Sequence, residues 1–247
     1  MPKHRFYLPT ESWKSEVLTL VDEEAHHCKD VMRCREGDDI FVFDGNGRVA
    51  ECKIQSLSKR QVIVEITCQE TVPKPSAAIT LGQAIPKGKN MELIIQKATE
   101  LGVQSIVPLI SDHTVVQLNA KERAKKQDKW QRVVIEACKQ CGQNWMPKIA
   151  PIITAYEFIA AAEEEWKLIA AIDDRAEPFH PIFDKLGGKS SSACILIGPE
   201  GDLTAAEVGC ALEAGFSPAS LGPIILRSET AAIYCLSILA HQLLNRD

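Results

Sequence analysis

No apolar stretch of this sequence is long enough to cross a bilayer as a helix. The longest, Ala231 to Ala240, falls well short of the ~20 residues that such a helix needs. The opening residues MPKHRFYLP also lack the apolar core of a secretory signal. We therefore expect a soluble, cytoplasmic protein with no membrane partner.

Excess positive charge and the common nucleotide-binding fingerprints are missing as well. The net charge of −5 argues against bulk electrostatic binding of nucleic acid, although a local basic patch would still bind it. No G-x-G-x-x-G follows the first strand predicted after residue 77, and G-x-x-x-x-G-K-[ST] occurs nowhere. The sequence thus offers no support for a glycine-fingerprint dinucleotide site or a P-loop.

The nine cysteines form no disulfide or metal pattern. Their number is odd, and free thiols in a reducing compartment are the simplest interpretation. Cys138 and Cys141 have the spacing of a redox or metal pair, but they fall inside a predicted helix with no second Cys or His pair nearby, which favours an ordinary helix face. His26 and His27 are adjacent and do not share a helix face, so we expect no metal site.

Two regions differ in their hydrophobic pattern. Residues 1–72 are β-rich: alternating runs flank the turn Asp44 to Gly47, which predicts a hairpin, QVIVEITC adds a strand, and a short helix ends near Gly37. We expect a small β-barrel-like domain there. ETVPKPSAA then predicts an extended linker at residues 72–77.

Residues 77–247 alternate between strand and helix patterns. The predicted strands are apolar on both faces: AITLGQAI, VQSIVPLI, WKLIAAID, ACILIGPE and LGPIIL. The predicted helices are NMELIIQKATELG, QDKWQRVVIEACKQCG, TAAEVGCALEAG, which a capping box from Thr204 to Glu207 opens, and the C-terminal run. This alternation predicts an α/β domain whose parallel sheet is covered by helices on both sides.

Two strand ends in this domain carry glycine, proline and polar residues. They are ILIGPEGD, residues 195–202, and LGPIILRSET, residues 221–230. Ligands of open α/β sheets bind beyond the carboxyl ends of the strands, where glycines allow close approach and helix N-termini offer unpaired N–H groups. Alone, the first stretch is compatible with a simple turn, and the second with an Arg227–Glu229 ion pair and a cap from Ser228 or Thr230. Together they predict one binding site.

The segment from Lys121 to Lys148 is basic although the protein is acidic. It has eight Lys or Arg residues against three acidic ones, and it contains Trp130 and Trp145. Such a helix suits an RNA backbone and its exposed bases, but a solvated helix with core tryptophans fits equally well. The strand-end loop PKGKN, residues 86–90, is likewise compatible with a phosphate contact or with a solvated turn.

Several longer stretches occur in an order that is similar to one known family. HRFYL, HHCKDVMRCREGDDIFVFDGNG, KGKNMELIIQKATELGV, KWQRVVIEACKQCG, IGPEGD and LGPIILRSETA resemble the RsmE family, the bacterial uridine-N3 methyltransferases of small-subunit ribosomal RNA in the SPOUT superfamily. The resemblance runs nearly end to end. It implies a PUA-like RNA-binding β-barrel over residues 1–72 and an α/β parallel-sheet SPOUT methyltransferase domain over residues 77–247 with a C-terminal trefoil knot.

The resemblance also implies a cofactor, a substrate and an assembly. S-adenosylmethionine would bind in the knot, 16S ribosomal RNA in the small ribosomal subunit would be methylated at uracil N3, and the protein would be a homodimer. The implied cofactor residues are Ile172, Ile197, Gly198, Pro199, Glu200, Gly201, Leu221, Gly222, Leu226, Ser228 and Thr230. The implied RNA contacts are Lys3, His4, Arg5, Arg33, Lys87, Lys89, His113, Arg132 and Gln143.

The chemistry of uracil N3 suggests roles for the polar residues at the two strand ends. N3 is a poor nucleophile until it loses its proton, and the negative charge then spreads over two ring oxygens. We expect Arg227 to stabilise that charge, because preorganised charges of opposite sign are usually the largest aid to such a step. Glu229 either holds Arg227 or accepts the proton, and Glu200 is a second candidate base.

Three positions depart from the usual pattern of the family. Asp202 stands where a second glycine is common, His113 where an arginine is typical, and Gln143 where arginine is frequent. Three other functions stay open: a SPOUT methyltransferase acting on transfer RNA or large-subunit RNA, an RNA-binding assembly factor without activity, and a thiol redox protein that uses Cys138 and Cys141.

Overall fold

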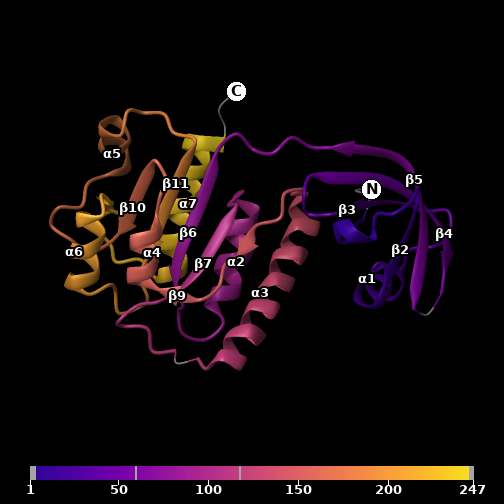
Figure 1. Cartoon of the computed structure of the whole chain (residues 1–247), viewed down its shortest axis with the longest axis horizontal. Helices are drawn as coiled ribbons and strands as arrows, with labels where there is room; N and C mark the ends of the chain where they lie inside the picture. The colour runs from indigo at the N-terminus through magenta and orange to yellow at the C-terminus, as the bar shows by residue number, and fades with distance from the viewer. Residues whose placement is uncertain (1–3, 59, 117, 245–247) are drawn as a thin grey trace. The chain divides into compact units, whose positions relative to one another are not determined.

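A computed structural model describes residues 4–58, 60–116 and 118–244 of the chain (Figure 1). The chain forms two compact units. The first contains Met1–Lys74 and Ile135–Met146, and the second contains Pro75–Val134 and Pro147–Asp247. The chain therefore passes from one unit to the other three times, and each unit combines two separate segments of the sequence.

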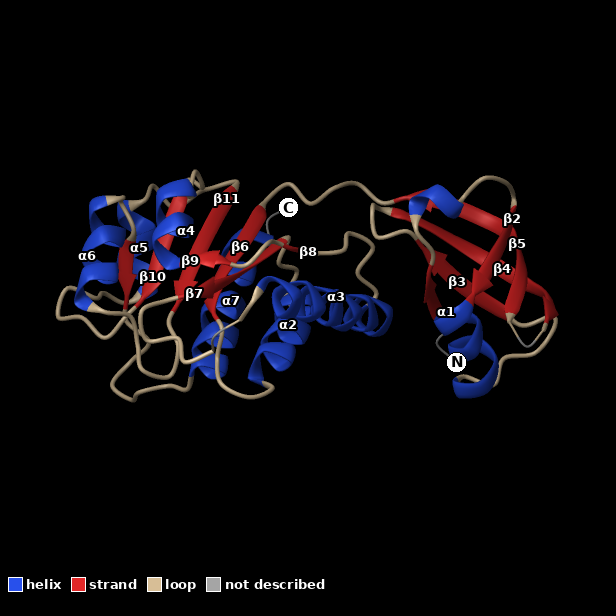
Figure 2. Ribbon diagram, turned by 60° about the horizontal axis from the view of Figure 1, so that its bottom comes forward, coloured by secondary structure: helices blue, strands red, loops and turns tan. Residues whose placement is uncertain are grey.

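The first unit is built on a five-stranded sheet in the order β1-β3-β4-β5-β2 (Figure 2). Its strands are β1 (Arg5–Tyr7), β2 (Val17–Val21), β3 (Asp39–Phe43), β4 (Arg48–Leu57) and β5 (Gln61–Thr71). β3 and β4 pair antiparallel on either side of the turn at residues 44–47, so the predicted hairpin is confirmed. All five strands contribute side chains to one apolar core.

The helical segment of this unit is shorter than predicted. After a 3-10 turn (Thr10–Ser12), it consists of α1 (Asp22–His26) and one π-helical turn (His27–Val31), so it ends well before Gly37. Arg33 has a φ of +56°, in the left-handed region that a continuing right-handed helix cannot use. This backbone turn explains the early end.

The second unit is built on a parallel sheet in the order β12-β10-β11-β6-β7-β8, with β9 paired to β7. Its strands are β6 (Ala78–Ala84), β7 (Ser105–Ile110), β8 (Lys148–Ile149), β9 (Ile153–Thr154), β10 (Trp166–Ala170), β11 (Ser192–Ile197) and β12 (Ser217–Ala219). Its helices are α2 (Asn90–Glu100), α4 (Ala155–Ala161), α5 (Phe179–Lys185), α6 (Ala205–Glu213) and α7 (Ser228–Leu244). α3 (Ala120–Cys141) begins in this unit, and its last turns belong to the first unit.

Helices cover both faces of the parallel sheet (Figure 2). Gly82 and Gln83 are neighbours on β6, so they face opposite sides. A Cβ at Gly82 would lie 2.6 Å from the Phe158 ring of α4, whereas the Gln83 amide donates to Ser228 at the start of α7. α4 and α6 therefore share a core with one face, while α7 packs on the other face and against α2, which confirms the predicted layering.

One predicted strand is wrong. LGPIIL, residues 221–226, is an irregular loop, and the strand that precedes α7 is β12 instead. Gly222 has a φ of +102° and Pro223 has no backbone N–H, so this segment cannot continue a regular ladder. As a result Ile224 and Ile225 are 73% and 81% exposed.

α7 carries the longest apolar run of the sequence. It buries residues such as Ala232, Cys235 and Leu239, which face the sheet and α2. Tyr234 is 44% exposed on the same helix. Across the described residues, no helix combines the length and the hydropathy that a membrane span requires.

Candidate functional site

A cavity of about 490 Å³ lies where β10 and β11 end. Three segments form most of its wall: residues 170–173 at the end of β10, residues 197–200 at the end of β11, and residues 220–228, which lead into α7. The volume lies in the range of small-molecule sites. The carboxyl edge of a parallel sheet is also where α/β folds bind their ligands.

The cavity brings together most of the residues that the sequence singled out. Those in its wall are Ile172, Ile197, Gly198, Pro199, Glu200, Leu221, Gly222, Leu226, Arg227 and Ser228. Gly201 and Thr230 are exposed and do not form part of the wall. Asp202, the last residue of the predicted ILIGPEGD stretch, also lines the wall, and so does Ser220, which lies just outside the second predicted stretch. The signal for Ser220 was that it adjoins Leu221.

A buried chain of hydrogen bonds joins three elements around the cavity. Gln83 on β6 donates to the Ser228 hydroxyl at 2.9 Å, and Ser228 donates to the Gly198 carbonyl oxygen at 2.7 Å. Gln83 is fully buried, and the sequence analysis did not assign it to the site. The one signal for it was a polar residue within an apolar strand. These two hydrogen bonds hold the start of α7 against the end of β11 and so fix two walls of the cavity.

Polar contacts also hold the loop after β11. The backbone N–H of Lys87 donates to Glu200 Oε1 at 2.9 Å, and His113 Nδ1 lies 2.9 Å from the Gly201 carbonyl oxygen. A Cβ at Gly198 would lie 3.2 Å from Leu203, which leaves little room for a side chain. At Gly198 the wall is therefore formed by backbone.

The polar residues at the start of α7 differ in their surroundings. Arg227 is exposed and lines the cavity. Glu229 is half-buried, and its Oε2 has no hydrogen-bond partner within the described part of the chain. Within that same part no ion pair joins Arg227 to Glu229, so the guanidinium is available to a ligand in the cavity.

Asp173 brings a negative charge to the wall of the cavity. The Arg175 guanidinium donates to its two carboxylate oxygens, at 2.8 and 2.7 Å. These hydrogen bonds lower the pKa of Asp173 to about 2. The carboxylate is consequently ionised throughout the neutral range.

The predicted RNA contacts are divided between the two units. In the second unit Lys87, Lys89, His113 and Arg132 are exposed, and in the first unit His4 and Arg33 are exposed while Gln143 is half-buried. Arg5 is engaged within the first unit, where it donates to Asn144 Oδ1 at 2.6 Å and lies 4.9 Å from the centre of the Phe43 ring. Lys3 lies outside the described residues.

The two tryptophans of the basic segment serve the fold. Trp130 is 2% exposed, and the Trp145 indole N–H donates to the carbonyl oxygens of Val72 and Pro73, each at 3.0 Å. A Cβ at Gly47 would lie 2.6 Å from the Trp145 ring. Because both rings are packed against protein, the structure favours core tryptophans over platforms for RNA bases.

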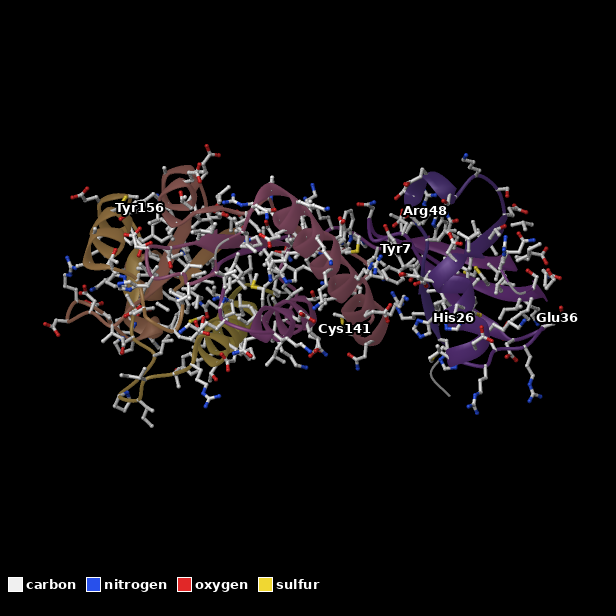
Figure 3. The ribbon with its side chains drawn as sticks, turned by 90° about the horizontal axis from the view of Figure 1, so that it is seen from below. Tyr7, His26, Glu36, Arg48, Cys141 and Tyr156 are labelled. Atoms are coloured by element: carbon white, nitrogen blue, oxygen red, sulfur yellow. The ribbon has the colours of Figure 1, made fainter. Side chains whose placement is uncertain are left out.

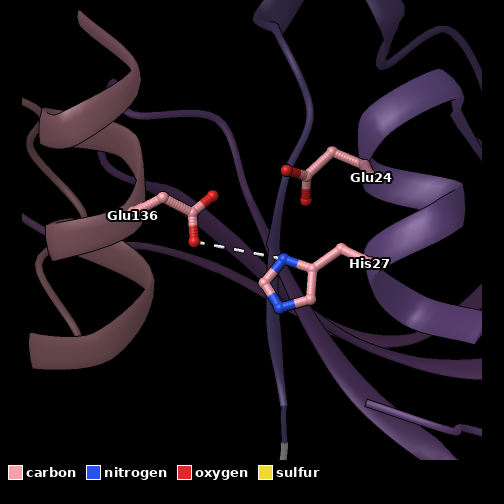
Figure 4. Close-up of side chains that lie close together, drawn as sticks. All are labelled: Glu24, His27 and Glu136. Carbon is pink, nitrogen blue, oxygen red and sulfur yellow. Dashed lines mark ion pairs between the residues drawn. The ribbon is translucent and has the colours of Figure 1, made fainter. Parts of the chain in front are cut away.

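Glu24, His27 and Glu136 meet in the first unit, with potential ligand atoms within 4.8 Å of one another (Figure 4). A positively charged side chain of the protein already lies among these three residues. The buried Lys139 ammonium binds Glu24, lies 2.8 Å from Glu136 and is 3.4 Å from His27 Nδ1. Repulsion from Lys139 disfavours a metal ion at this place, so the cluster is best described as an internal ion network.

Cys138 and Cys141 lie near the end of α3, and Figure 3 labels Cys141 there. Cys141 is exposed and Cys138 is buried. Burial, together with the neighbouring Cys141, raises the pKa of the Cys138 thiol to about 12. A nucleophilic redox cysteine needs the opposite shift. The pair therefore fits a helix face better than a redox site.

Comparison with known proteins identifies the same two parts of the chain. A family model described as an RNA methyltransferase domain matches residues 73–240, and one described as an RNA methyltransferase PUA domain matches residues 20–67. The ribosomal RNA small subunit methyltransferase E of Bacillus subtilis is 34% identical over 237 residues, which cover 93% of this chain and 91% of that protein. The protein of the same name from Aquifex aeolicus is 33% identical, with 96% and 98% covered.

Solved structures lead to the same family. The crystal structure of a ribosomal RNA small subunit methyltransferase E from Neisseria gonorrhoeae, bound to S-adenosyl methionine, superposes with a TM-score of 0.87. Its sequence is 34% identical, and 97% of each chain is covered. The domain match, the relatives and this structure agree over nearly the whole length, and the chain therefore belongs to the ribosomal RNA small subunit methyltransferase E family.

Proposed function

We propose that this chain transfers the methyl group of S-adenosylmethionine to N3 of a specific uridine in the 16S ribosomal RNA of the small subunit. The observation that carries the proposal is the convergence of three loops on one cavity whose wall includes Arg227. Family membership supports the reaction class, and the Neisseria relative is bound to this cofactor. The choice of uracil N3 rests on the resemblance of the IGPEGD and LGPIILRSETA stretches to the RsmE family.

The cavity suits this cofactor in size and in chemistry. Ile197 and Leu226 offer apolar surface to an adenine ring, and the backbone at Gly198 allows close approach. Asp173 and Arg227 supply charges of both signs, as the ammonium and carboxylate of a methionine group require. When bound, S-adenosylmethionine supplies a methyl group on a positively charged sulfur.

The residues of the cavity divide the remaining work. Arg227 stabilises the negative charge that grows on the uracil oxygens as N3 loses its proton, because a fixed guanidinium needs little reorganisation. Glu200 lies in the wall and is the candidate that accepts this proton, whereas Glu229 is outside the wall. Ser228 and Gln83 hold the loops of the cavity in place. This matters because methyl transfer depends on the alignment of the donor and acceptor atoms.

RNA is held by basic and polar side chains of both units. The match of residues 20–67 to a PUA domain supports an RNA-binding role for the first unit, with His4 and Arg33 at its surface. In the second unit Lys87 and His113 adjoin the loop after β11 through their contacts with Glu200 and Gly201. These two residues would meet the RNA segment that carries the target base.

The finer family features also belong to the proposal. We propose that the second unit is a SPOUT domain whose C-terminal region forms a trefoil knot, and that the enzyme acts as a homodimer in the cytoplasm. The parallel sheet and the position of the cavity support the SPOUT assignment. The exposed side chains of Ile172, Ile224 and Ile225 beside the cavity support a partner chain at this edge.

The proposed role of Arg227 is tested by Arg227→Ala and Arg227→Lys. We expect Arg227→Ala to lower kcat by roughly 100-fold, the usual effect of removing one transition-state donor. Arg227→Lys keeps the charge but loses the planar fork, so it should recover part of the rate. The measurement is transfer of radiolabelled methyl groups to small subunits that lack the modification.

Binding of the cofactor by calorimetry is the control for these variants. A near-normal dissociation constant with a low kcat places Arg227 in the chemistry. Turnover close to wild type in Arg227→Ala would remove it from the mechanism, and loss of cofactor binding would make it a residue that shapes the cavity.

A further inference from the structure

The cavity wall carries more negative than positive charge. Its ionisable side chains are Asp173, Glu200, Asp202 and Arg227, which gives a formal charge of three negatives against one positive. Arg175 offsets Asp173 through their ion pair at 2.7 Å. Glu200 is exposed to solvent, which screens its charge. Asp202 differs from both.

Asp202 is half-buried and is held by neutral groups. Its Oδ1 accepts from the Leu203 N–H at 2.8 Å, and its Oδ2 accepts from the Ile172 N–H at 3.3 Å. Both donors are backbone amides, so they orient the carboxylate without adding a formal positive charge. The side chain thereby links the loop after β11 to the loop after β10.

The backbone at Asp202 is a left-handed turn with a φ of +59°. Glycine is the usual residue in this region, and Asp or Asn is tolerated because the short polar side chain bonds locally. This chain therefore accepts a less favourable backbone residue and gains a carboxylate in the cavity wall. His113 Nδ1 lies 3.1 Å from the Asp202 carbonyl oxygen and adds to the support of the turn.

We propose that Asp202 is a specificity-determining residue that makes the cavity favour the charged methyl donor over the uncharged product. The inference rests on the proposed function, since it takes S-adenosylmethionine as the ligand. Methyl transfer leaves S-adenosylhomocysteine, whose sulfur is a neutral thioether, while the rest of the molecule is unchanged. A carboxylate in the wall attracts the sulfonium and has no such attraction for the thioether. Product release is thus favoured without loss of donor affinity.

The test compares the two ligands on the full chain by isothermal titration calorimetry. Asp202→Asn removes the charge, keeps a polar side chain and tolerates the left-handed backbone. We expect Asp202→Asn to lower the ratio of the product dissociation constant to the donor dissociation constant by about three- to tenfold. Asp174→Asn is the matched control, because Asp174 is an exposed neighbour that does not line the cavity, and it should leave the ratio unchanged.

A purely structural role for Asp202 gives a different result. Loosening the two loops would weaken both ligands alike, so a ratio unchanged in Asp202→Asn overturns the inference. Asp202→Gly suits the φ of +59° and gives the same readout if the Asn variant does not fold.

The outcomes also separate this inference from the proposed function. Binding of both ligands with a ratio that Asp202→Asn does not alter overturns the role of Asp202 and leaves the methyltransferase intact. Failure of the wild-type chain to bind either ligand overturns the proposed function and this inference with it.

Discussion

Ser228 is the residue on which the geometry of the site depends most directly. It accepts a hydrogen bond from Gln83 and donates one to Gly198, and it is 5% exposed. The sequence suggests only a helix cap at this position, because a cap is a local pattern. The actual partners lie 145 and 30 residues away, and no spacing in the sequence reveals them.

Ser228→Ala should therefore destabilise the protein. It leaves the buried Gln83 amide without its hydroxyl acceptor, and an unsatisfied buried polar group costs about 1–3 kcal/mol. We expect that loss in the free energy of unfolding measured with urea, together with weaker binding of S-adenosylmethionine. Ser237→Ala is the matched control, because Ser237 lies on the same helix, is exposed and bonds locally to Ile233. Equal effects of the two variants would contradict the role of Ser228.

The limits of sequence reasoning at this scale are physical. Ile197, Gly198 and Glu200 line one cavity, and the sequence could place them together because they lie at the end of a strand of a parallel sheet, where ligands bind. Gln83 contacts the site from the side of a strand, through a partner on another element. Such a contact depends on packing, which the order of residues does not display.

α3 has a buried apolar side and an exposed basic side. Trp130 and Val134 are buried on one side. Lys121, Lys125 and Arg132 are exposed. The helix therefore uses Trp130 for packing, while these three positively charged side chains reach solvent.

Replacing Lys121 and Lys125 by glutamine should weaken RNA binding in a way that depends on salt. Each lysine that meets a phosphate contributes about 0.7 to 0.9 to the slope of log K against log salt. We expect the double variant to have a shallower slope in filter-binding titrations of unmodified small subunits. Lys185→Gln with Lys189→Gln removes the same charge from exposed positions, one at the end of α5 and one after it, and serves as the control. A slope that does not change would exclude this helix from the RNA surface.

Elements were predictable where a local signal set their limits. α6 begins at the Thr204–Glu207 capping box that the sequence shows, and α3 ends before Gly142, whose φ is +83°. The loop at residues 221–226 was misread, because an apolar run resembles a strand whether or not it is buried. Ile224 and Ile225 are instead exposed beside a cavity.

At the scale of the whole molecule, α3 links the two units covalently. Its residues up to Val134 belong to the second unit and those from Ile135 to the first. A division at the proline-rich linker, residues 72–77, accounts for one of the three crossings between units. The other two arise within and after a continuous helix, where composition does not change and no linker pattern marks them.

Three exposed isoleucines lie beside the cavity. Ile172, Ile224 and Ile225 are 70%, 73% and 81% exposed, and all three line the cavity. Burying them against a second chain would remove apolar surface from water and shield the site, so we expect a mass of twice 27.2 kDa in analytical ultracentrifugation. Ile225→Asp should shift the protein to a single chain and weaken the cofactor complex, because a charge cannot be buried there without a partner.

Val31→Asp is the control for this experiment, since Val31 is 58% exposed in the first unit and does not line the cavity. It should leave both the mass and the cofactor affinity unchanged. A wild-type chain that sediments as a single copy at micromolar concentration would contradict the dimer, and the isoleucines would then have to meet the RNA. A dimer that persists in Ile225→Asp would mean that the partner chain lies against another surface, and that the cavity is complete within one chain.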